Sequence, residues 1–325
     1  MTRWPICAPI YCYTSRFFIS LIIIVTGVFS SNRVFATKYE STPKEKFQDN
    51  LSFVAIIKNE APYIKEWIEF HKLVGVDRFY IYDNESTDNV RDVLKEYIDK
   101  GEVVYTYFPG QCKQNPAYMD AVNKYKNKTK YMGFIDLDEF VIPVTEKSLV
   151  KVIDEILSKN KKSAGVAINW RTYGSSGHKS MPKGLVTENY KNRAEDSWKY
   201  HNNIKTICNP RLVSNFHTHY ATYEKPYYAV NENGKRIPTW YNFENSCQKL
   251  RINHYFTKSF DEFIKKRERG CADCNRTRPI SDFYERDKNN VYDYIMEPYV
   301  KLLKKKGENN LWKRKYSPLL WHWVF

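Results

Sequence analysis

Three carboxylates lie close together in the segment YMGFIDLDEFVIP, residues 131–143. Asp136 and Asp138 are one residue apart, and Glu139 follows directly, between two apolar runs. Carboxylates at this spacing on an extended turn are hard oxygen ligands that can reach a divalent cation, directly or through water. Magnesium and manganese ions held in this way typically also bind substrate phosphates. A D-x-D pattern alone is a weak signal, because a solvated acidic turn produces it as well.

Strand-like and helix-like segments alternate around these carboxylates. The apolar runs of strand length are LSFVAIIK from Leu51, RFYIYD from Arg78, EVVYTYF from Glu102 and YMGFID from Tyr131. A helix is expected with Pro62 near its first turn, and two more are expected from Asp88 to Lys100 and from Pro116 to Tyr125. This alternation predicts right-handed crossovers and a doubly wound, mostly parallel α/β sheet.

Polar residues stand at the carboxyl ends of the predicted strands. Lys58-Asn59-Glu60 follow the first strand, Asp83-Asn84 end the second, and Asp136-Leu137-Asp138 end the fourth. Open α/β sheets bind ligands in the crevice outside these strand ends. The sequence therefore places the three carboxylates at the edge of a binding crevice.

The composition is that of a globular protein with an anionic partner. Of the 325 residues, 42% are hydrophobic and 27% charged, which excludes wholesale disorder. The net charge of +15 favours an anionic substrate or surface, but the lysines are scattered, so we expect no nucleic-acid partner. The aromatic share of 16% suits a carbohydrate-binding surface, and core packing is the alternative.

Seven cysteines are present, and five of them follow the N-terminal region. An odd number in the body of the chain predicts one or two disulfides with a free thiol left over. Cys271-Ala-Asp-Cys274 is a single C-x-x-C without a second pair, and so only a weak zinc signal.

An apolar segment near the N-terminus predicts a membrane anchor or a signal peptide. Residues 17–32 carry no charge, which is somewhat short of the roughly 20 residues of a spanning helix. A cleavage site after Ala36 is the alternative to an uncleaved anchor, and the basic residues before the segment favour a cytoplasmic N-terminus. We expect residues 1–36 to be the tail and signal-anchor or signal peptide, residues 37–50 a stem, and residues 51–325 the body.

Three blocks of the body resemble glycosyltransferase family 92 and its family 2-like relatives, which are nucleotide-sugar glycosyltransferases of the GT-A type. The blocks are IIKNEAPYIKEWIEFHKLVGVDRFYIYDNESTDN, KYMGFIDLDEFVIP and INHYFTKSFDEFIKKRERG. The resemblance covers residues 51 to 270 and implies a GT-A fold, which is a Rossmann-like, doubly wound sheet. It implies a nucleotide-sugar-binding half at residues 51–143 and an acceptor-binding half at residues 144–325.

The resemblance also implies roles for single residues near the strand ends. Asn59, Glu60 and Asp83 match residues that line the nucleotide pocket. Asp136 and Asp138 match the metal-binding aspartates of the DxD motif. The remaining two matches are His254, as the histidine that completes the metal site, and Lys258, four residues later, as a phosphate contact. The implied cofactor is Mn²⁺ or Mg²⁺.

The acceptor side and the general base are less defined. The resemblance matches Trp170, Gly174 and Ser175 to an acceptor-binding loop, where Trp170 would stack on a sugar face, although core packing of Trp170 is equally open. An inverting transfer needs a base for the acceptor hydroxyl. A cation would lower the basicity of Asp136 and Asp138, so the candidates are Glu139, Asp196 and Glu262.

The sequence therefore predicts a metal-dependent hexosyltransferase that moves a hexose, galactose by the resemblance, from a UDP-sugar to a glycan acceptor with inversion. A non-catalytic sugar- or nucleotide-binding module on the same fold is the alternative. The order of tail, apolar segment, stem and body predicts a single-pass type II membrane protein, of the Golgi in a eukaryote. A secreted route after cleavage, or a bacterial membrane or cytosolic enzyme, remains open.

Overall fold

The computed structural model describes residues 46–274 and 276–309. The predicted tail and apolar segment, and most of the stem, lie outside these residues, so the membrane placement stays a prediction. Within the described ranges, no helix has both the length and the apolar character needed to cross a bilayer.

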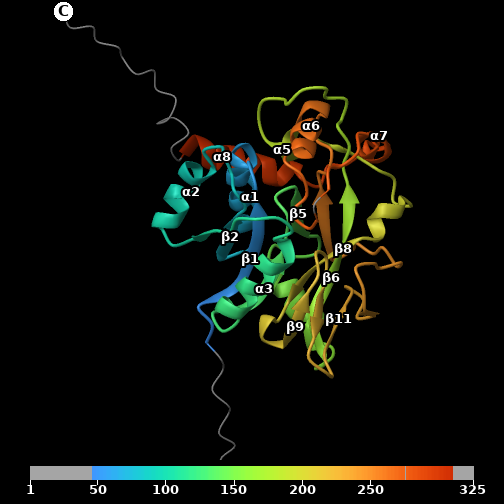
Figure 1. The fold of residues 1–325 in the computed structure, drawn as a ribbon. Helices are drawn as coiled ribbons and strands as arrows, with labels where there is room; N and C mark the ends of the chain where they lie inside the picture. Colours follow the sequence, from blue (N-terminus) through green and yellow to red (C-terminus); the bar gives the residue numbers. More distant parts are fainter. Residues whose placement is uncertain (1–45, 275, 310–325) are drawn as a thin grey trace, which may run out of the picture. The chain divides into compact units, whose positions relative to one another are not determined.

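A ten-stranded sheet organises the fold (Figure 1). Its first half contains β1 (Asp49–Ile57), β2 (Arg78–Asp83), β3 (Val103–Tyr107) and β4 (Thr129–Phe134) in the order β3-β2-β1-β4. All three pairings between these strands are parallel. The predicted α/β class with a mostly parallel sheet is confirmed.

Helices cover both faces of this half. Along β1, Phe53 and Ala55 pack in one apolar cluster with α1 (Ala61–Leu73) and α2 (Val90–Asp99). Val54 and Ile56 pack in a second cluster with α3 (Gln114–Tyr125). Alternate residues of a strand point to opposite faces, so a continuous apolar run is what a strand covered on both sides requires.

The second half contributes strands that are distant in the sequence. β8 (Ile204–Cys208) is antiparallel to β4 and to β6 (Ser163–Thr172), and β11 (Tyr228–Val230) and β12 (Arg236–Ile237) extend that edge. β13 (Leu250–His254) pairs with β6 and with β5 (Glu139–Pro143). The β5–β13 register sets His254 opposite Glu139, beside the D-x-D turn.

The remaining elements of the described residues are mostly short. They are α4 (Leu149–Ser158), α5 (Val186–Asn189), β7 (Asn192–Arg193), η1 (Lys199–Asn202), η2 (Pro210–Leu212), β9 (Val213–Phe216), β10 (Ala221–Tyr223), α6 (Phe260–Glu268), α7 (Ser281–Arg286), β14 (Val291–Tyr292) and α8 (Glu297–Asn309). The expected disulfides are not formed, because the five cysteines of the described residues are free thiols.

Helix α1 fastens the D-x-D turn to the sheet. The Trp67 indole donates to the backbone carbonyls of Asp136 at 3.1 Å and of Glu139 at 2.9 Å. One turn later, His71 Nδ1 lies 2.9 Å from the Trp67 carbonyl, and His71 Nε2 accepts from the amide of Val141 at 3.1 Å. Both rings are fully buried, so the neutral His71 ring satisfies two buried backbone groups.

The buried ring of His71 predicts an acid-dependent loss of stability. Burial lowers the pKa of His71 to about 3, whereas an unfolded histidine titrates near 6.5. The stabilisation is therefore complete above about pH 6.5 and is lost as the pH falls towards about 3. Between about pH 7 and pH 5, this group should lower the free energy of unfolding by about 2 kcal/mol.

Urea unfolding of wild type and His71→Gln at both pH values measures this effect. Glutamine can donate to one backbone group and accept from the other, so the variant should fold and show the smaller pH dependence. His217→Gln, which changes an exposed histidine, is the matched control. Equal pH dependence in wild type and His71→Gln would contradict a neutral buried ring.

Candidate active site

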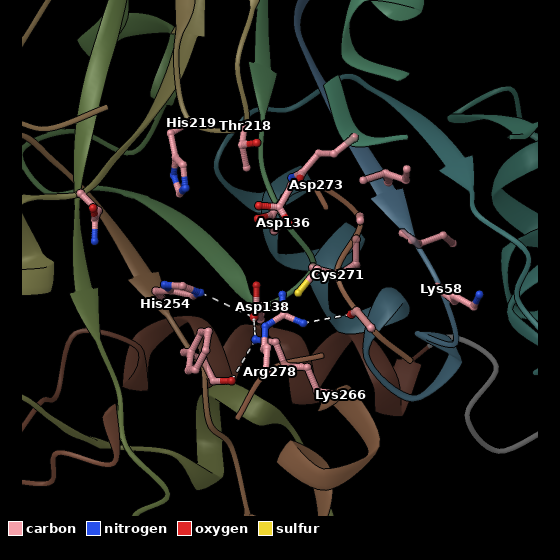
Figure 2. A pocket seen from close by; sticks show the side chains of 18 of the residues that line it. Lys58, Asp136, Asp138, Thr218, His219, His254, Lys266, Cys271, Asp273 and Arg278 are labelled. Carbon is pink, nitrogen blue, oxygen red and sulfur yellow. Dashed lines mark hydrogen bonds and ion pairs between the residues drawn. The ribbon is translucent and has the colours of Figure 1, made fainter. Parts of the chain in front are cut away.

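A cavity of about 650 Å³ opens at the carboxyl ends of the strands. It is lined by residues that follow β1, β2 and β4, by the ends of β6 and β13, and by the segment after α6. Figure 2 shows Asp138 between His254 and Lys266, with Asp136 in the same cavity. The predicted location at the strand ends is therefore the place where the structure has its cavity.

The side chain of Asp136 is held on both of its oxygens. Oδ1 accepts from the Tyr118 hydroxyl at 3.0 Å and from Gln114 Nε2 at 3.1 Å, both from α3. Oδ2 forms an ion pair of 2.9 Å with Nζ of Lys205, on β8. The carboxylate lines the cavity in a fixed orientation.

Lys205 and Glu139 form a buried pair behind the cavity. Both side chains are fully buried, and Lys205 Nζ lies 3.8 Å from Glu139 Oε2. Burial raises the pKa of Glu139 well above its ordinary value, and Asp136 adds to this effect while Lys205 opposes it. Burial alone would lower the pKa of Lys205, but Asp136 and Glu139 outweigh burial and raise it. Lys205 therefore supplies the positive charge that balances Asp136 and Glu139 in this turn.

Asp138, His254 and Lys266 form the second charged group. Asp138 Oδ2 lies 3.5 Å from His254 Nε2 and accepts a hydrogen bond from Lys266 Nζ, on α6. Burial alone would raise the pKa of Asp138, but Lys266 and His254 hold it well below its ordinary value. Burial lowers the pKa of Lys266 to about 8, against the attraction of Asp138. The carboxylate is therefore ionised and paired.

The predicted metal ligands do not form one compact cluster. His254 and Asp138 are in contact, while Asp136 is engaged with α3 and β8. Among the described residues, the three-ligand group in which all ligand atoms lie within 4.8 Å of one another consists of Cys271, Asp273 and Cys274.

Of the four predicted donor-binding residues, Glu60 lines the cavity, where it forms an ion pair with Arg269. Asn59 and Asp83 shape the loop after β2 instead. Asn59 Oδ1 accepts from the Thr87 amide at 2.7 Å, and Asp83 Oδ1 accepts from the Ser86 amide at 2.9 Å. Neither residue is part of the described cavity lining.

Lys258 is also absent from the described cavity lining. Its ammonium group lies 3.9 Å from the centre of the Tyr63 ring. The residue precedes α6 and has a φ of 50°, which directs the chain differently from the helix that follows. The cation that meets the carboxylates from this part of the chain is Lys266, on the helix itself.

Of the three predicted acceptor-binding residues, one lines the cavity and two do not. Trp170 lines the cavity, and the centre of its ring lies 4.2 Å from the centre of the His254 ring. Ser175 donates to Asp287 through its hydroxyl at 3.1 Å, and a Cβ on Gly174 would lie 2.6 Å from the Lys288 carbonyl. Gly174 and Ser175 therefore pack against the segment after α7, away from the described lining.

None of the three predicted general bases is part of the described lining. Glu139 is buried with Lys205. Asp196 is mostly exposed and pairs with Arg193 at 2.8 Å. Glu262 caps α6 through Ser259 and accepts from the Tyr63 hydroxyl at 2.8 Å.

Several residues in or directly behind the cavity lining were not predicted from the sequence, although the sequence pattern around some of them indicates their position. Lys266 and Arg269 are three residues apart on α6 and its C-cap, so helical spacing could have placed them on one face. Lys205, which lies behind the lining, stands in an otherwise apolar-rich strand, IKTIC, where a lysine needs a buried acid. Asp273 and Arg278, in an irregular segment, had no such signal.

The chain is similar in sequence to several curated proteins. A family 92 protein of Ricinus communis is 28% identical over 136 residues, which cover 42% of this chain and 25% of that protein. A family 92 protein of Oryza sativa is 26% identical and covers 58% and 32%. The Caenorhabditis elegans beta-1,4-galactosyltransferase galt-1 is 23% identical and covers 65% and 49%. The chain thus spans about a quarter to a half of the length of these curated relatives.

Solved structures are more distant. S. aureus TarS, residues 1–349, overlaps with a TM-score of 0.38 and 11% identity, over 83% of this chain and 75% of that chain. The Mycobacterium tuberculosis glucosyl-3-phosphoglycerate synthase, in complex with Mn²⁺ and UDP, overlaps with a TM-score of 0.26 and 20% identity, over 43% and 47%. These overlaps do not bear on the chemistry of this chain.

The family assignment follows from the model of glycosyltransferase family 92, which matches residues 54–278. The match includes the three sequence blocks, the strands from the second half of β1 to β13, and the cavity residue Lys266 of α6. It extends over more than half of the 325 residues. The chain belongs to glycosyltransferase family 92.

Proposed function

We propose that this chain is a hexosyltransferase that binds a UDP-sugar in the cavity and transfers the sugar to a glycan hydroxyl with inversion. The observation that carries the proposal is the pairing of Asp138 and His254 in a cavity at the carboxyl ends of the strands. Basic side chains line the same cavity, among them Lys266, Arg269 and Arg278. Galactose is the proposed hexose because one relative is named a galactosyltransferase. Family membership and the cavity support this reading over a binding module.

The residues present fit a divalent cation. A carboxylate oxygen and an imidazole nitrogen converge within 3.5 Å of each other, and both side chains are buried. Carboxylates suit Mg²⁺ and Mn²⁺, and imidazole suits borderline metals. We propose Asp138 and His254 as the ligands, with Asp136 held beside them by Lys205. A bound cation would supply positive charge against the diphosphate.

The side chains of the chain itself supply the remaining charge stabilisation. Lys266 and Arg278 line the cavity, and Arg278 donates to the Gly270 carbonyl at 3.0 Å. Cations fixed in a partly buried site stabilise negative charge that develops on a leaving group, without having to reorganise. We propose that these two residues contact the departing UDP.

The general base must reach the acceptor hydroxyl inside the cavity. Of the carboxylates that line it, Glu60, Asp136 and Asp138 are paired with Arg269, Lys205 and Lys266. Asp273 forms no ion pair within the described residues, and its oxygen accepts from the Cys274 thiol at 3.3 Å. Asp273 is therefore our proposed base in place of the three earlier candidates.

A thermal-shift panel tests the donor and the metal. The purified chain is measured with UDP, GDP, UDP-galactose and UDP-glucose, each with Mn²⁺ or with EDTA. At a ligand concentration about 100 times Kd, binding should add about 2.7 kcal/mol of stability. We expect the largest shift with a uridine nucleotide and Mn²⁺, and its metal-dependent part should be absent in Asp138→Asn.

Asp99→Asn, on the exposed surface of α2, is the matched control and should keep the full shift. A UDP shift that is equal with Mn²⁺ and with EDTA would reject the metal site. No shift with any nucleotide would reject the proposed donor and favour the non-catalytic reading.

Asp273→Asn tests the general base. We expect kcat to fall about a hundredfold, within the range of general-base contributions, while the UDP-dependent thermal shift is unchanged. A pH–rate profile that loses its acidic limb in the variant would support proton abstraction by Asp273. A kcat equal to that of the wild type in Asp273→Asn would exclude Asp273 as the general base.

Lys205→Met tests whether the buried lysine holds the D-x-D turn. The substitution leaves Asp136 and Glu139 without their counter-charge, and it should lower the free energy of unfolding by about 3–5 kcal/mol in urea. Adding Glu139→Gln should recover part of the loss. Lys95→Met removes an exposed pair with Asp99 and should cost less than about 1 kcal/mol. Equal costs for the two lysines would refute a structural role of Lys205.

A further inference from the structure

We propose that Trp240, Tyr241 and Phe243 form an aromatic platform that stacks on sugar rings of an oligosaccharide acceptor, outside the position of the sugar that receives the hexose. The inference rests on the proposed function, because it assigns the acceptor class of the same site. It gives a role to part of the high aromatic share of 16% that neither the core nor the donor site explains.

The three rings are neighbours at the surface, where Trp240 and Phe243 are exposed and Tyr241 between them is half-buried. Trp240 is 49% exposed and Phe243 is 83% exposed, the largest value among the large hydrophobic side chains of the described residues. The ring centres of Trp240 and Tyr241 are 5.0 Å apart, and those of Tyr241 and Phe243 are 4.7 Å apart, in edge-to-face arrangements. Exposed rings grouped in this way are a typical sign of a binding surface.

Buried polar contacts fix the platform to the sheet. Asn242, between the rings, is buried and donates through its side chain to Asn169 Oδ1 of β6 at 2.6 Å. The amide of Asn242 donates to the Asn202 carbonyl at 2.8 Å. The rings are therefore held in place before any ligand arrives, which lowers the entropic cost of binding.

The platform continues into the cavity. Trp240 lines the cavity together with Trp170 and Tyr200. Tyr241 forms a β-bridge with Asn203, whose carbonyl accepts from the Trp170 amide at 3.1 Å. An oligosaccharide with its terminal sugar beside Trp170 would therefore contact Trp240 where it leaves the cavity.

A carbohydrate is the occupant that fits this chemistry. The apolar C–H faces of a sugar ring complement the negative faces of aromatic rings. Polar groups lie at the edge of the platform, where Asn202 donates to the Tyr241 hydroxyl at 3.2 Å. The alternation of ring faces and hydrogen-bonding groups suits a ligand that carries both C–H faces and hydroxyls.

An array of defined neutral oligosaccharides, with one to about eight sugars, tests the platform. Wild type should bind members of about three or more sugars more tightly than the shorter ones that share the same terminal sugar. Phe243→Ala should weaken binding to the longer members about fivefold, the effect of one aromatic contact, and leave the short ones unchanged. Trp240→Ala should weaken binding to the longer members at least as strongly.

Tyr107→Ala removes a ring that is 59% exposed on β3, outside the described cavity lining, and is the matched control. The UDP-dependent thermal shift shows that each variant is folded. A platform variant that keeps the wild-type length preference, or a wild type without such a preference, would overturn the proposal. Failure of the proposed function is a separate result, because it appears as a wild type without a UDP shift.

Discussion

The structure depends on the neutralisation of three carboxylates within four residues. Asp138 and Glu139 are buried and Asp136 is half-buried, and a carboxylate removed from water is costly when its charge has no partner. Lys205 meets Asp136 and Glu139 from β8, and Lys266 meets Asp138 from α6. Each cation comes from a segment far along the chain. The acidic turn therefore fixes where the second half of the chain must lie.

The backbone of the same turn is fixed by a second set of contacts. Trp67 and His71, on α1, satisfy the carbonyls of Asp136 and Glu139 and the amide of Val141. The turn is thus held by an aromatic helix face on one side and by two lysines on the other. This leaves Asp138 and His254 directed into the cavity with little freedom to move, which is the preorganisation that binding and charge stabilisation require.

The sequence predicted the first half of the fold because its signals are local. Strand-length apolar runs and helical spacing lie within a few residues of each other, and the strand ends directed attention to Glu60, Asp136 and Asp138. The second half is built from short strands with distant partners, so its pairing leaves no periodic signal. Lys258 shows the limit: the resemblance implies a phosphate contact for it, and only the structure shows that its ammonium group lies over the Tyr63 ring and that the ammonium group paired with Asp138 belongs to Lys266.

The charge of the cavity lining bears on both of the proposed substrates. Six basic and four acidic side chains of the described residues line it; the basic ones are Lys58, Lys266, Arg269, Arg276, Arg278 and Arg286. Since three of the acids already have a basic partner, the remaining positive charge is available to an anionic ligand. The aromatic platform, which begins at Trp240 in the cavity lining and extends away from it, carries no charge of its own. A ligand with an anionic diphosphate would therefore meet the basic lining of the cavity, whereas a neutral ligand with C–H faces would meet the aromatic platform at its edge, which is the separation that our proposed transfer between two substrates needs.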